Sequence, residues 1–357
     1  MSGSIETNSG RKSGTIGAKV AGPTISASDP TSTTNATLGT QWANSTSGEF
    51  YILTDATTDS NGWTNVGSGS GDIKAFHGSG STSAYAAGGE DSSFSNVYEK
   101  FSLTSDGNAS DVADLTASRY RMPGQSSSVS GYTSGGFGGS YSNVIDKFSF
   151  SSEGNATDVG DLTSARMNSG GQWSSTHGYI AAGWLGSNSN VIEKFTFASD
   201  ANATDVGDLT VSTDARSGQT SETHGYTSGG TSSNVIEKFA FASDGNATDV
   251  GDLTASRAGT AGQQSPSNGY TSGGNGVVNV IEKFSFSSDG NASDIADLTV
   301  ARHYMCGQSS DDHGYTSGGN ISANSDVIDK FTLASDANAT DVGNLTSART
   351  GCAGQQV

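Results

Sequence analysis

The chain has 357 residues and a formal net charge of −19, which disfavours nucleic-acid binding because phosphates would be repelled rather than neutralised. Hydrophobic residues make up only 32 % of the chain and Gly contributes 50 residues, a composition that by itself is typical of disorder. Only a sequence repeat, described below, argues for a folded protein.

No stretch approaches the roughly 18 consecutive apolar residues of a membrane helix. Residues 1–17 lack the apolar core of a secretory signal, so we expect no membrane insertion. The two cysteines, Cys306 and Cys352, are too few for a disulfide framework.

The N-terminal part of the chain divides into two segments. Residues 1–36 are rich in Ser, Thr and Gly, and we expect them to be extended or flexible. Residues 37–71 are expected to form a small β-module, with two or three strands within 38–67 that contain Trp42 and Trp63. This segment resembles modules found before or between larger domains in phage tail and fibre proteins. Its tryptophans could stack on a sugar, but such residues more often form the core of the module.

The chain from residue 72 to residue 357 consists of six similar units. The Phe of a recurring Lys-Phe pair marks them at Phe101, Phe148, Phe195, Phe239, Phe284 and Phe331, 44 to 47 residues apart. Such a period is typical of propeller blades. Each unit contains four short runs with strand character, and in five of the six units an Asp-Gly or Asp-Ala turn joins the third to the fourth. The sequence therefore predicts an all-β fold, a six-bladed β-propeller with four antiparallel strands per blade.

Three recurring motifs carry a resemblance to known proteins. The text "GYTSGG", the text "NVIEKF" and the Arg that ends "SAR" or "ASR" resemble a kelch-type blade over residues 72–357. One departure is that "DVGDL" stands where a kelch blade has the Trp of its fourth strand. The series "GYTSGG…NVIEKF…DGNATDVGDLT" is also similar to repeat proteins of marine bacteriophage (cyanophage-like) virions, including tail-fibre proteins.

The two ends of the repeat region suggest how a ring would close. The first unit begins with its second strand, at "SAYAAGGE", while Gly351–Val357 reads as a first strand with no unit after it. We expect Gly351–Val357 to complete the first blade. The segment "IKAFHGSG" at 73–80 competes for that position, in which case the N-terminal strands and the C-terminal strand would form a seventh blade.

Each unit has one recurring Lys and one recurring Arg. The lysines are 100, 147, 194, 238, 283 and 330, each directly after an acid, and the arginines are 119, 166, 216, 257, 302 and 349. Because unconstrained surface charges drift, we expect these residues to have fixed partners between blades. A solvated strand face is the alternative.

Candidate sites for chemistry are weak. Asp106, Asn108, Asp111 and Asp114 are oxygen donors of the kind that Ca²⁺ prefers, but Asp and Asn are also common turn residues. His177, His224 and His313 occupy the same position in three units, whereas a catalytic centre needs one unique constellation. A copper oxidase of the kelch type would need a cluster of Tyr, His and Cys, which neither cysteine provides. We therefore expect a protein that is not an enzyme and has no cofactor, with Ca²⁺ the one candidate.

The unrepeated parts of the units are the more informative. In a four-stranded blade, the loops after strands two and four lie on one face, and these are the loops that vary. The candidate receptor-binding residues on that face are aromatic: Phe94, Tyr120, Phe137, Tyr141, Trp184 and Tyr304. We take Trp184 as the best anchor, because it stands in place of the second Gly of the Gly-Gly pair. Unconstrained drift of the loops is the alternative explanation.

The resemblance implies a function in the virion, with assembly in the host cytoplasm. We expect a tail fibre or surface adhesin that binds a host glycan or protein receptor through the variable loops. The alternative is a purely structural virion protein, a capsid decoration or fibre module that binds neighbouring subunits. In both cases the N-terminal segment would bind other virion proteins, and the chain would be a homo-oligomer in the particle.

Overall fold

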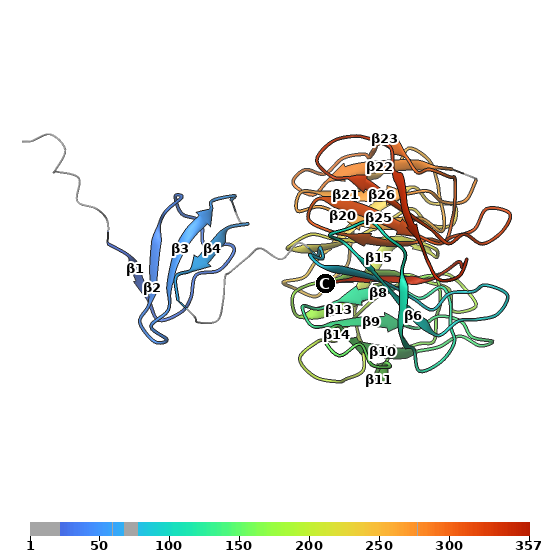
Figure 1. Ribbon diagram of the computed structural model, residues 1–357, viewed down its shortest axis with the longest axis horizontal. Helices are drawn as coiled ribbons and strands as arrows, with labels where there is room; N and C mark the ends of the chain where they lie inside the picture. Colours follow the sequence, from blue (N-terminus) through green and yellow to red (C-terminus); the bar gives the residue numbers. More distant parts are fainter. Residues whose placement is uncertain (1–21, 59, 68–77, 277) are drawn as a thin grey trace, which may run out of the picture. The chain divides into compact units, whose positions relative to one another are not determined.

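The computed structural model describes residues 22–58, 60–67, 78–276 and 278–357. Their regular secondary structure is entirely β, with 28 strands in seven four-stranded sheets (Figure 1). The strands belong to two compact units, within Met1–Ala75 and Phe76–Val357.

The first unit contains one sheet, which we call the N-terminal sheet. Its strands, in spatial order, are β1 (Thr24–Ser26), β2 (Gln41–Asn44), β3 (Phe50–Asp55) and β4 (Gly62–Asn65), with β1 parallel to β2 and the other pairs antiparallel. Tyr51, Leu53 and Trp63 are its buried core, and the ring of Trp42 packs edge-on against that of Trp63 at 5.9 Å. Trp63 is therefore a core residue, and the half-buried Trp42 packs against it.

The second unit contains six sheets, each built from four antiparallel strands, numbered here from sheet 1 to sheet 6. Sheet 1 contains β28 (Ala353–Gln356), β5 (Ser83–Ala87), β6 (Val97–Ser102) and β7 (Ser110–Asp114); sheet 2 contains β8 (Gly124–Ser126), β9 (Ser130–Ser134), β10 (Val144–Ser149) and β11 (Thr157–Asp161); sheet 3 contains β12 (Gly170–Trp173), β13 (His177–Ala181), β14 (Ser189–Thr196) and β15 (Thr204–Thr213). Sheet 4 contains β16 (Ser217–Thr220), β17 (His224–Ser228), β18 (Val235–Ala240) and β19 (Thr248–Asp252); sheet 5 contains β20 (Ala261–Gln264), β21 (Asn268–Ser272), β22 (Val280–Ser285) and β23 (Ser293–Asp297); sheet 6 contains β24 (Cys306–Ser309), β25 (His313–Ser317), β26 (Val327–Thr332) and β27 (Thr340–Asn344). The arrangement is consistent with a β-propeller.

The described residues contain seven four-stranded, blade-like sheets, so the predicted count of six is wrong. The additional one is the N-terminal sheet, for which only two or three strands were predicted. Its edge strand β1 is a three-residue Thr-Ile-Ser segment in a Ser/Thr-rich stretch, and so carries no alternation that would mark a strand. The N-terminal sheet is also not the seventh blade considered above, because the C-terminal strand β28 pairs with β5.

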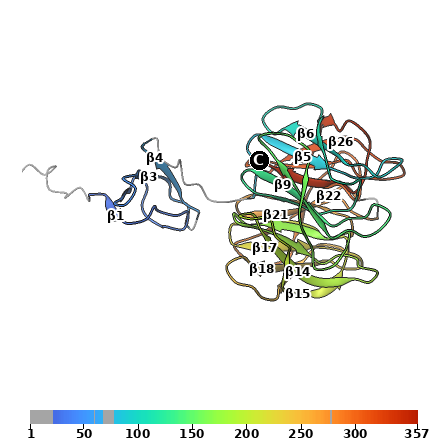
Figure 2. The same ribbon diagram turned by 90° about the horizontal axis from the view of Figure 1, so that it is seen from below.

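Ring closure by Gly351–Val357 is confirmed. Strand β28 pairs antiparallel with β5, with Gln355 opposite Tyr85, so the C-terminus lies beside the first repeat unit (Figure 2). The innermost strands β8, β12, β16, β20, β24 and β28 each contact the next, and β28 contacts β8. Of the competing segment 73–80, residues 73–77 lie outside the described residues, and Gly80 forms a bridge to Ser310.

The innermost strands approach one another so closely that each has a Gly at the contact. These are Gly124, Gly171, Gly218, Gly262, Gly307 and Gly354, and a Cβ added to any of them would lie 2.1–2.4 Å from a carbonyl oxygen of the neighbouring strand's Gly. The Gln after each Gly donates from its side-chain amide to the carbonyl of a Tyr on the second strand of the adjacent sheet, at 2.9–3.3 Å. The recurring Gly-Gln pair thus joins neighbouring sheets at the axis.

Buried ion pairs join the same sheets farther from the axis. Each recurring Arg pairs with the acid on the third strand of the next sheet: Arg119–Asp146, Arg166–Glu193, Arg216–Glu237, Arg257–Glu282, Arg302–Asp329 and Arg349–Glu99. The side chains are at most 3 % exposed. Between sheets 5 and 6, for example, the carboxylate of Asp329 accepts a hydrogen bond from Arg302 Nη2 at 2.7 Å. The same carboxylate accepts hydrogen bonds from the backbone amide of Thr299 at 3.2 Å and from its hydroxyl at 2.6 Å. The expectation of fixed partners between blades is confirmed, and the solvated strand face is excluded for these arginines.

The recurring lysines form an outer set of contacts between sheets. Each binds an acid in the loop between the third and fourth strands of a neighbouring sheet: Lys100–Glu153, Lys147–Asp200, Lys194–Asp244, Lys238–Asp289, Lys283–Asp336 and Lys330–Asp106. In the same loops an Asn side-chain oxygen accepts a backbone N–H from the outermost strand of the preceding sheet at 3.0–3.1 Å, as Asn338 does from Asp297. The recurring loop that reads "DGNA", "DANA" or "EGNA", which we call the "DGNA" loop, is therefore an inter-sheet contact as well as a turn.

Removal of Gly351–Val357 should abolish cooperative unfolding of the second unit or lower its melting temperature strongly. The deletion takes away β28, the Gln355 hydrogen bond to the Tyr132 carbonyl and one glycine of the axial contact. Circular dichroism during heating would measure this, and a synthetic peptide of the same seven residues should restore part of the lost stability. A truncated chain that melts like the intact one would contradict ring closure as a source of stability.

The two sets of ion pairs should differ in their effect on stability. Asp329→Asn leaves the buried guanidinium of Arg302 without its counter-charge, and we expect a loss of about 3–5 kcal/mol in unfolding free energy. Lys283→Met removes an ion pair whose acid is 52 % exposed, and we expect a loss below about 1 kcal/mol. Denaturant unfolding of both variants tests this, and similar losses in the two would refute the distinction.

Candidate functional site

The two variable sets of loops meet on one face of the second unit. The loop that follows the fourth strand of one sheet pairs through its backbone with the loop that follows the second strand of the next sheet. Tyr120 and Phe137 exchange two hydrogen bonds, at 3.1 and 3.0 Å, and the pairs Met167–Trp184, His303–Asn320 and Thr350–Glu90 do the same. The expectation that both loop sets share a face is confirmed.

A closed ring of backbone hydrogen bonds surrounds the axis on this face. Its members are Arg121, Asn168, Ala215, Gly259, Tyr304 and Gly351, and the amide of each donates to the carbonyl of its neighbour in the ring at 2.6–2.9 Å. All six have φ between 53° and 67°, although only two are Gly. Left-handed backbone is unfavourable for the other four, so the ring of hydrogen bonds compensates local strain. We call this feature the mouth ring; it lines a cavity of about 70 Å³.

Five of the six candidate aromatic residues form a continuous group, which we call the aromatic belt: Phe94, Tyr120, Phe137, Tyr141 and Trp184. The ring of Phe94 stacks on Tyr120 with centroids 5.3 Å apart, and Phe137 lies 5.5–6.1 Å from the rings of Phe94, Tyr120 and Tyr141. Trp184 Nε1 donates to the Tyr141 hydroxyl at 2.9 Å. All five side chains are partly exposed. Loops of sheets 1, 2 and 3 thus build one aromatic surface.

Arg121 connects the sixth candidate, Tyr304, to the belt. Its guanidinium carbon lies 5.0 Å from the ring centroid of Tyr120 and 4.2 Å from that of Tyr304, both within the range of cation–π attraction. Burial raises the pKa of the Tyr304 hydroxyl, while the charge of Arg121 acts to lower it. Burial also lowers the pKa of the adjacent His303, and Arg121 adds to that shift. Arg121 was not predicted as a site residue, although it is a cation outside the recurring pattern of one Lys and one Arg per unit.

The alignment used to select Trp184 is wrong. In sheet 3 the positions of the Gly-Gly pair are held by Ala182, with φ 65°, and Gly183, with φ 114°, which match the values of 65° and 97° at Gly135–Gly136. Trp184 follows that pair and corresponds to Phe137 of sheet 2, as their equivalent backbone bridges show. The position of Trp184 on the variable face is nevertheless as expected.

The Ca²⁺ candidates are engaged in contacts within the protein. Asp106 pairs with Lys330, and the side-chain oxygen of Asn108 accepts the Asn344 amide at 3.1 Å. The amide of Asp114 donates to Asn155, and Asp111 is exposed. Among the described residues, no group of three or more His, Cys, Asp and Glu is placed to hold a metal ion.

The three equivalent histidines begin the second strands of their sheets, as their positions in the units suggested. His177 and His224 each share a hydrogen bond between Nδ1 and the hydroxyl of the preceding Thr at 2.8 Å, and burial lowers the pKa of all three histidines. They lie at the start of β13, β17 and β25, in separate sheets, and so form no common constellation.

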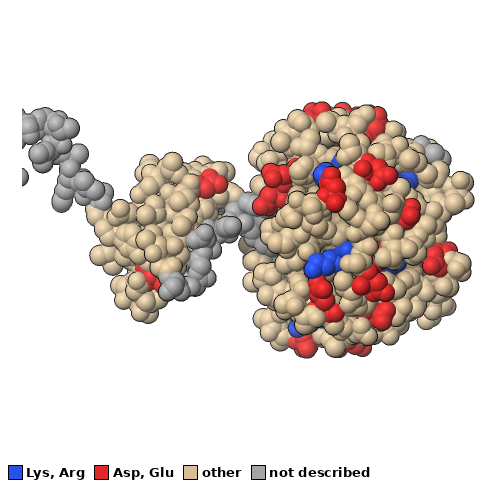
Figure 3. Space-filling view, viewed as in Figure 1, with Lys and Arg blue, Asp and Glu red and all other residues tan. Residues whose placement is uncertain are grey.

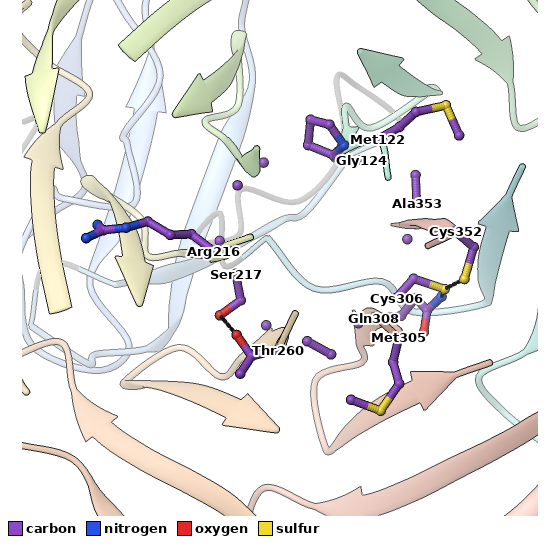
Figure 4. A pocket seen from close by; sticks show the side chains of 18 of the residues that line it. Met122, Gly124, Arg216, Ser217, Thr260, Met305, Cys306, Gln308, Cys352 and Ala353 are labelled. Carbon is purple, nitrogen blue, oxygen red and sulfur yellow. Dashed lines mark hydrogen bonds between the residues drawn. The ribbon is translucent and has the colours of Figure 1, made fainter. Parts of the chain in front are cut away.

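The two cysteines lie in contact beside the axial channel (Figure 4). Cys306 begins β24 and Cys352 immediately precedes β28, and their buried sulfur atoms are 2.7 Å apart. Their contact was not predicted. It follows once the last strand closes the ring, because sheets 6 and 1 then become neighbours.

The cavities along the axis are small or lined by hydroxyl groups. The channel in Figure 4 has a volume of about 90 Å³ and is bordered by the glycines of the innermost strands; Thr260 donates to Ser217 of the adjacent sheet at 3.1 Å along its wall. A further cavity of about 340 Å³ is lined by serines, Trp173 and the C-terminal residues Gln356 and Val357. Among the described lining residues, neither cavity places a hydroxyl or thiol beside a His, Asp or Glu.

No protein-family model matches this chain, and no curated protein matches it either. Across the described residues, no helix has the length and apolar character needed to cross a membrane.

The contact between Cys306 and Cys352 makes a further prediction. Oxidised glutathione should convert the two thiols to one disulfide, with two protons and two electrons transferred to give two glutathione thiols. Thiol titration after denaturation should then find no free Cys, and the melting temperature should rise because a bond now joins β24 to the closing strand. Cys352→Ser is the control; two titratable thiols after oxidation of the parent chain would contradict the contact.

Proposed function

We propose that sheets 1–6 together form a kelch-like β-propeller and that this propeller is a non-enzymatic recognition module. The observation that carries the proposal is the aromatic belt, in which unrepeated side chains from three sheets form one partly exposed surface on a repeated scaffold. The resemblance to marine phage virion repeats supports a place in the particle, as a tail fibre or surface adhesin that binds a host glycan or protein.

Loop folding does not require the belt. The turn that pairs Phe137 with Tyr141 in sheet 2 has a counterpart in sheet 6, which pairs Asn320 with Asn324. There the two side chains form an ordinary amide hydrogen bond of 2.7 Å. Because the same turn closes with polar residues, the aromatic residues of sheet 2 are not explained by backbone geometry.

The belt is also suited to binding by its rigidity. Its rings are held by stacking and by the hydrogen bond from Trp184 to Tyr141 before any ligand arrives. Little side-chain entropy would then be lost on binding, and an amphipathic aromatic surface suits both sugar rings and protein side chains. A purely structural virion protein, which binds neighbouring subunits through the same surface, is the alternative.

Trp184→Ala should weaken binding to host cells at least about tenfold, the effect expected of an aromatic anchor. The melting temperature should change little, because the indole is partly exposed and its one hydrogen bond is to Tyr141. Labelled full-length chain and a panel of cultured marine cyanobacteria would measure this, with Asn320→Ala in the equivalent loop position as the matched control.

A large loss of stability with cell binding intact would show that Trp184 is a packing residue. If the chain binds no cells but Trp184→Ala abolishes its self-association in analytical ultracentrifugation, the structural alternative is correct.

A further inference from the structure

Arg121 is the one cation of the described residues that lacks an acidic partner. The described chain contains the recurring lysines and arginines, all in ion pairs, and Arg121. The Nε atom of Arg121 is buried with no hydrogen-bond partner. In a protein of net charge −19, whose acidic side chains outnumber the basic ones on the face in Figure 3, an unpaired guanidinium needs an explanation.

The backbone holds Arg121 at the mouth ring. Its φ of 57° is a left-handed conformation, fixed by the hydrogen bond from its amide to Gly351 at 2.6 Å. Gly351 separates Arg121 from Tyr304 in the ring, and a Cβ on Gly351 would lie 3.1 Å from Arg121 Cγ and from Tyr120 Cδ2. The glycine therefore leaves the space in which the guanidinium reaches both tyrosine rings.

The rings of Tyr120 and Tyr304 contact the guanidinium and leave its in-plane donors without a partner. The Arg121 guanidinium carbon lies 5.0 Å and 4.2 Å from the two ring centroids, and a guanidinium carries five N–H donors for a ligand with acceptor oxygens. Asp214, whose charge acts on the Tyr304 hydroxyl, accepts a hydrogen bond from the Asn168 side chain at 2.9 Å. Asn168 and Arg121 both line the cavity of about 70 Å³.

We propose that the mouth ring binds an anionic sugar. The carboxylate of the sugar would bind Arg121, and the pyranose ring of the sugar would pack against Tyr120, Tyr304 and the adjoining aromatic belt. A planar guanidinium matches a carboxylate through two parallel hydrogen bonds. The cavity of about 70 Å³ has room for a carboxylate group but not for a whole sugar, which must lie outside on the aromatic rings. This proposal rests on the recognition function proposed above and gives its ligand class as a uronic-acid glycan.

Calorimetry on the full chain tests the proposal with two matched probes, oligogalacturonate and its methyl ester, which differ in the charge of the carboxyl group. We expect the acid to bind at least about tenfold more tightly than the ester, and Arg121→Gln to remove that difference. Lys283→Gln is the control, because it removes the same charge from an outer ion pair away from the mouth ring. Arg121→Lys keeps the charge but loses the planar pair of donors, so we expect it to bind oligogalacturonate only weakly. This variant replaces Arg121→Gln in the test if Arg121→Gln fails to fold.

Equal binding of acid and ester, undiminished binding by Arg121→Gln, or binding of neither probe would overturn the proposal. Binding of an Asp/Glu-rich peptide through Arg121 in place of the sugar would also overturn it and would indicate a protein partner. If Arg121→Gln keeps host-cell binding while Trp184→Ala loses it, the ligand class is wrong and the recognition function stands. If neither substitution affects cell binding, recognition does not use this face; if the parent chain binds no cells at all, the recognition function fails.

Discussion

A buried carboxylate on the third strand of each sheet, held by the Arg and Thr of the preceding sheet, is the contact on which the second unit depends. Each such carboxylate is out of reach of solvent, so an isolated one would be strongly destabilising. The Arg and the Thr that hold each carboxylate come from the preceding sheet. The six ion pairs form a closed circle because Arg349, which follows sheet 6, pairs with Glu99 of sheet 1. The six sheets therefore specify one another's positions, and closure of the ring satisfies the last carboxylate.

This constraint explains how a chain with only 32 % hydrophobic residues forms a packed unit. Small aromatic clusters lie between neighbouring sheets, for example Tyr132 with Phe195 and Phe197, and do not merge into one large core. Polar contacts supply the remainder: glutamines and glycines at the axis, buried ion pairs farther out, and the Asn and Lys contacts at the periphery. The recurring Gly, Gln, Arg, Thr, Lys, Asn and acidic positions thus have inter-sheet partners, whereas variation is concentrated in the loops after the second and fourth strands.

The strand order could be predicted because each unit repeats the same four runs. The closing role of Gly351–Val357 could be predicted because this segment reads as a first strand and the first repeat lacks one. Strand β1 was not predictable, since Thr24–Ser26 lacks both length and alternation. The face on which the aromatic residues lie could be predicted, because successive loops of an antiparallel sheet alternate between its two ends. Their convergence into one belt did not, because Phe94, Phe137 and Trp184 belong to three different sheets. The role of Arg121 was equally hidden, since it depends on a left-handed backbone and on Gly351, 230 residues away, as its neighbour in the ring.

The central claim is that a constant scaffold presents the aromatic belt and the mouth ring for recognition. Hydrogen exchange measured by mass spectrometry, on the full chain with and without an extract of host cell-surface glycans, tests it most directly. We expect slower exchange in the loops that contain Phe94, Tyr120–Arg121, Phe137–Tyr141 and Trp184, and unchanged exchange in the repeated "DGNA" loops. Slower exchange confined to the "DGNA" loops, or no change anywhere, would contradict the claim.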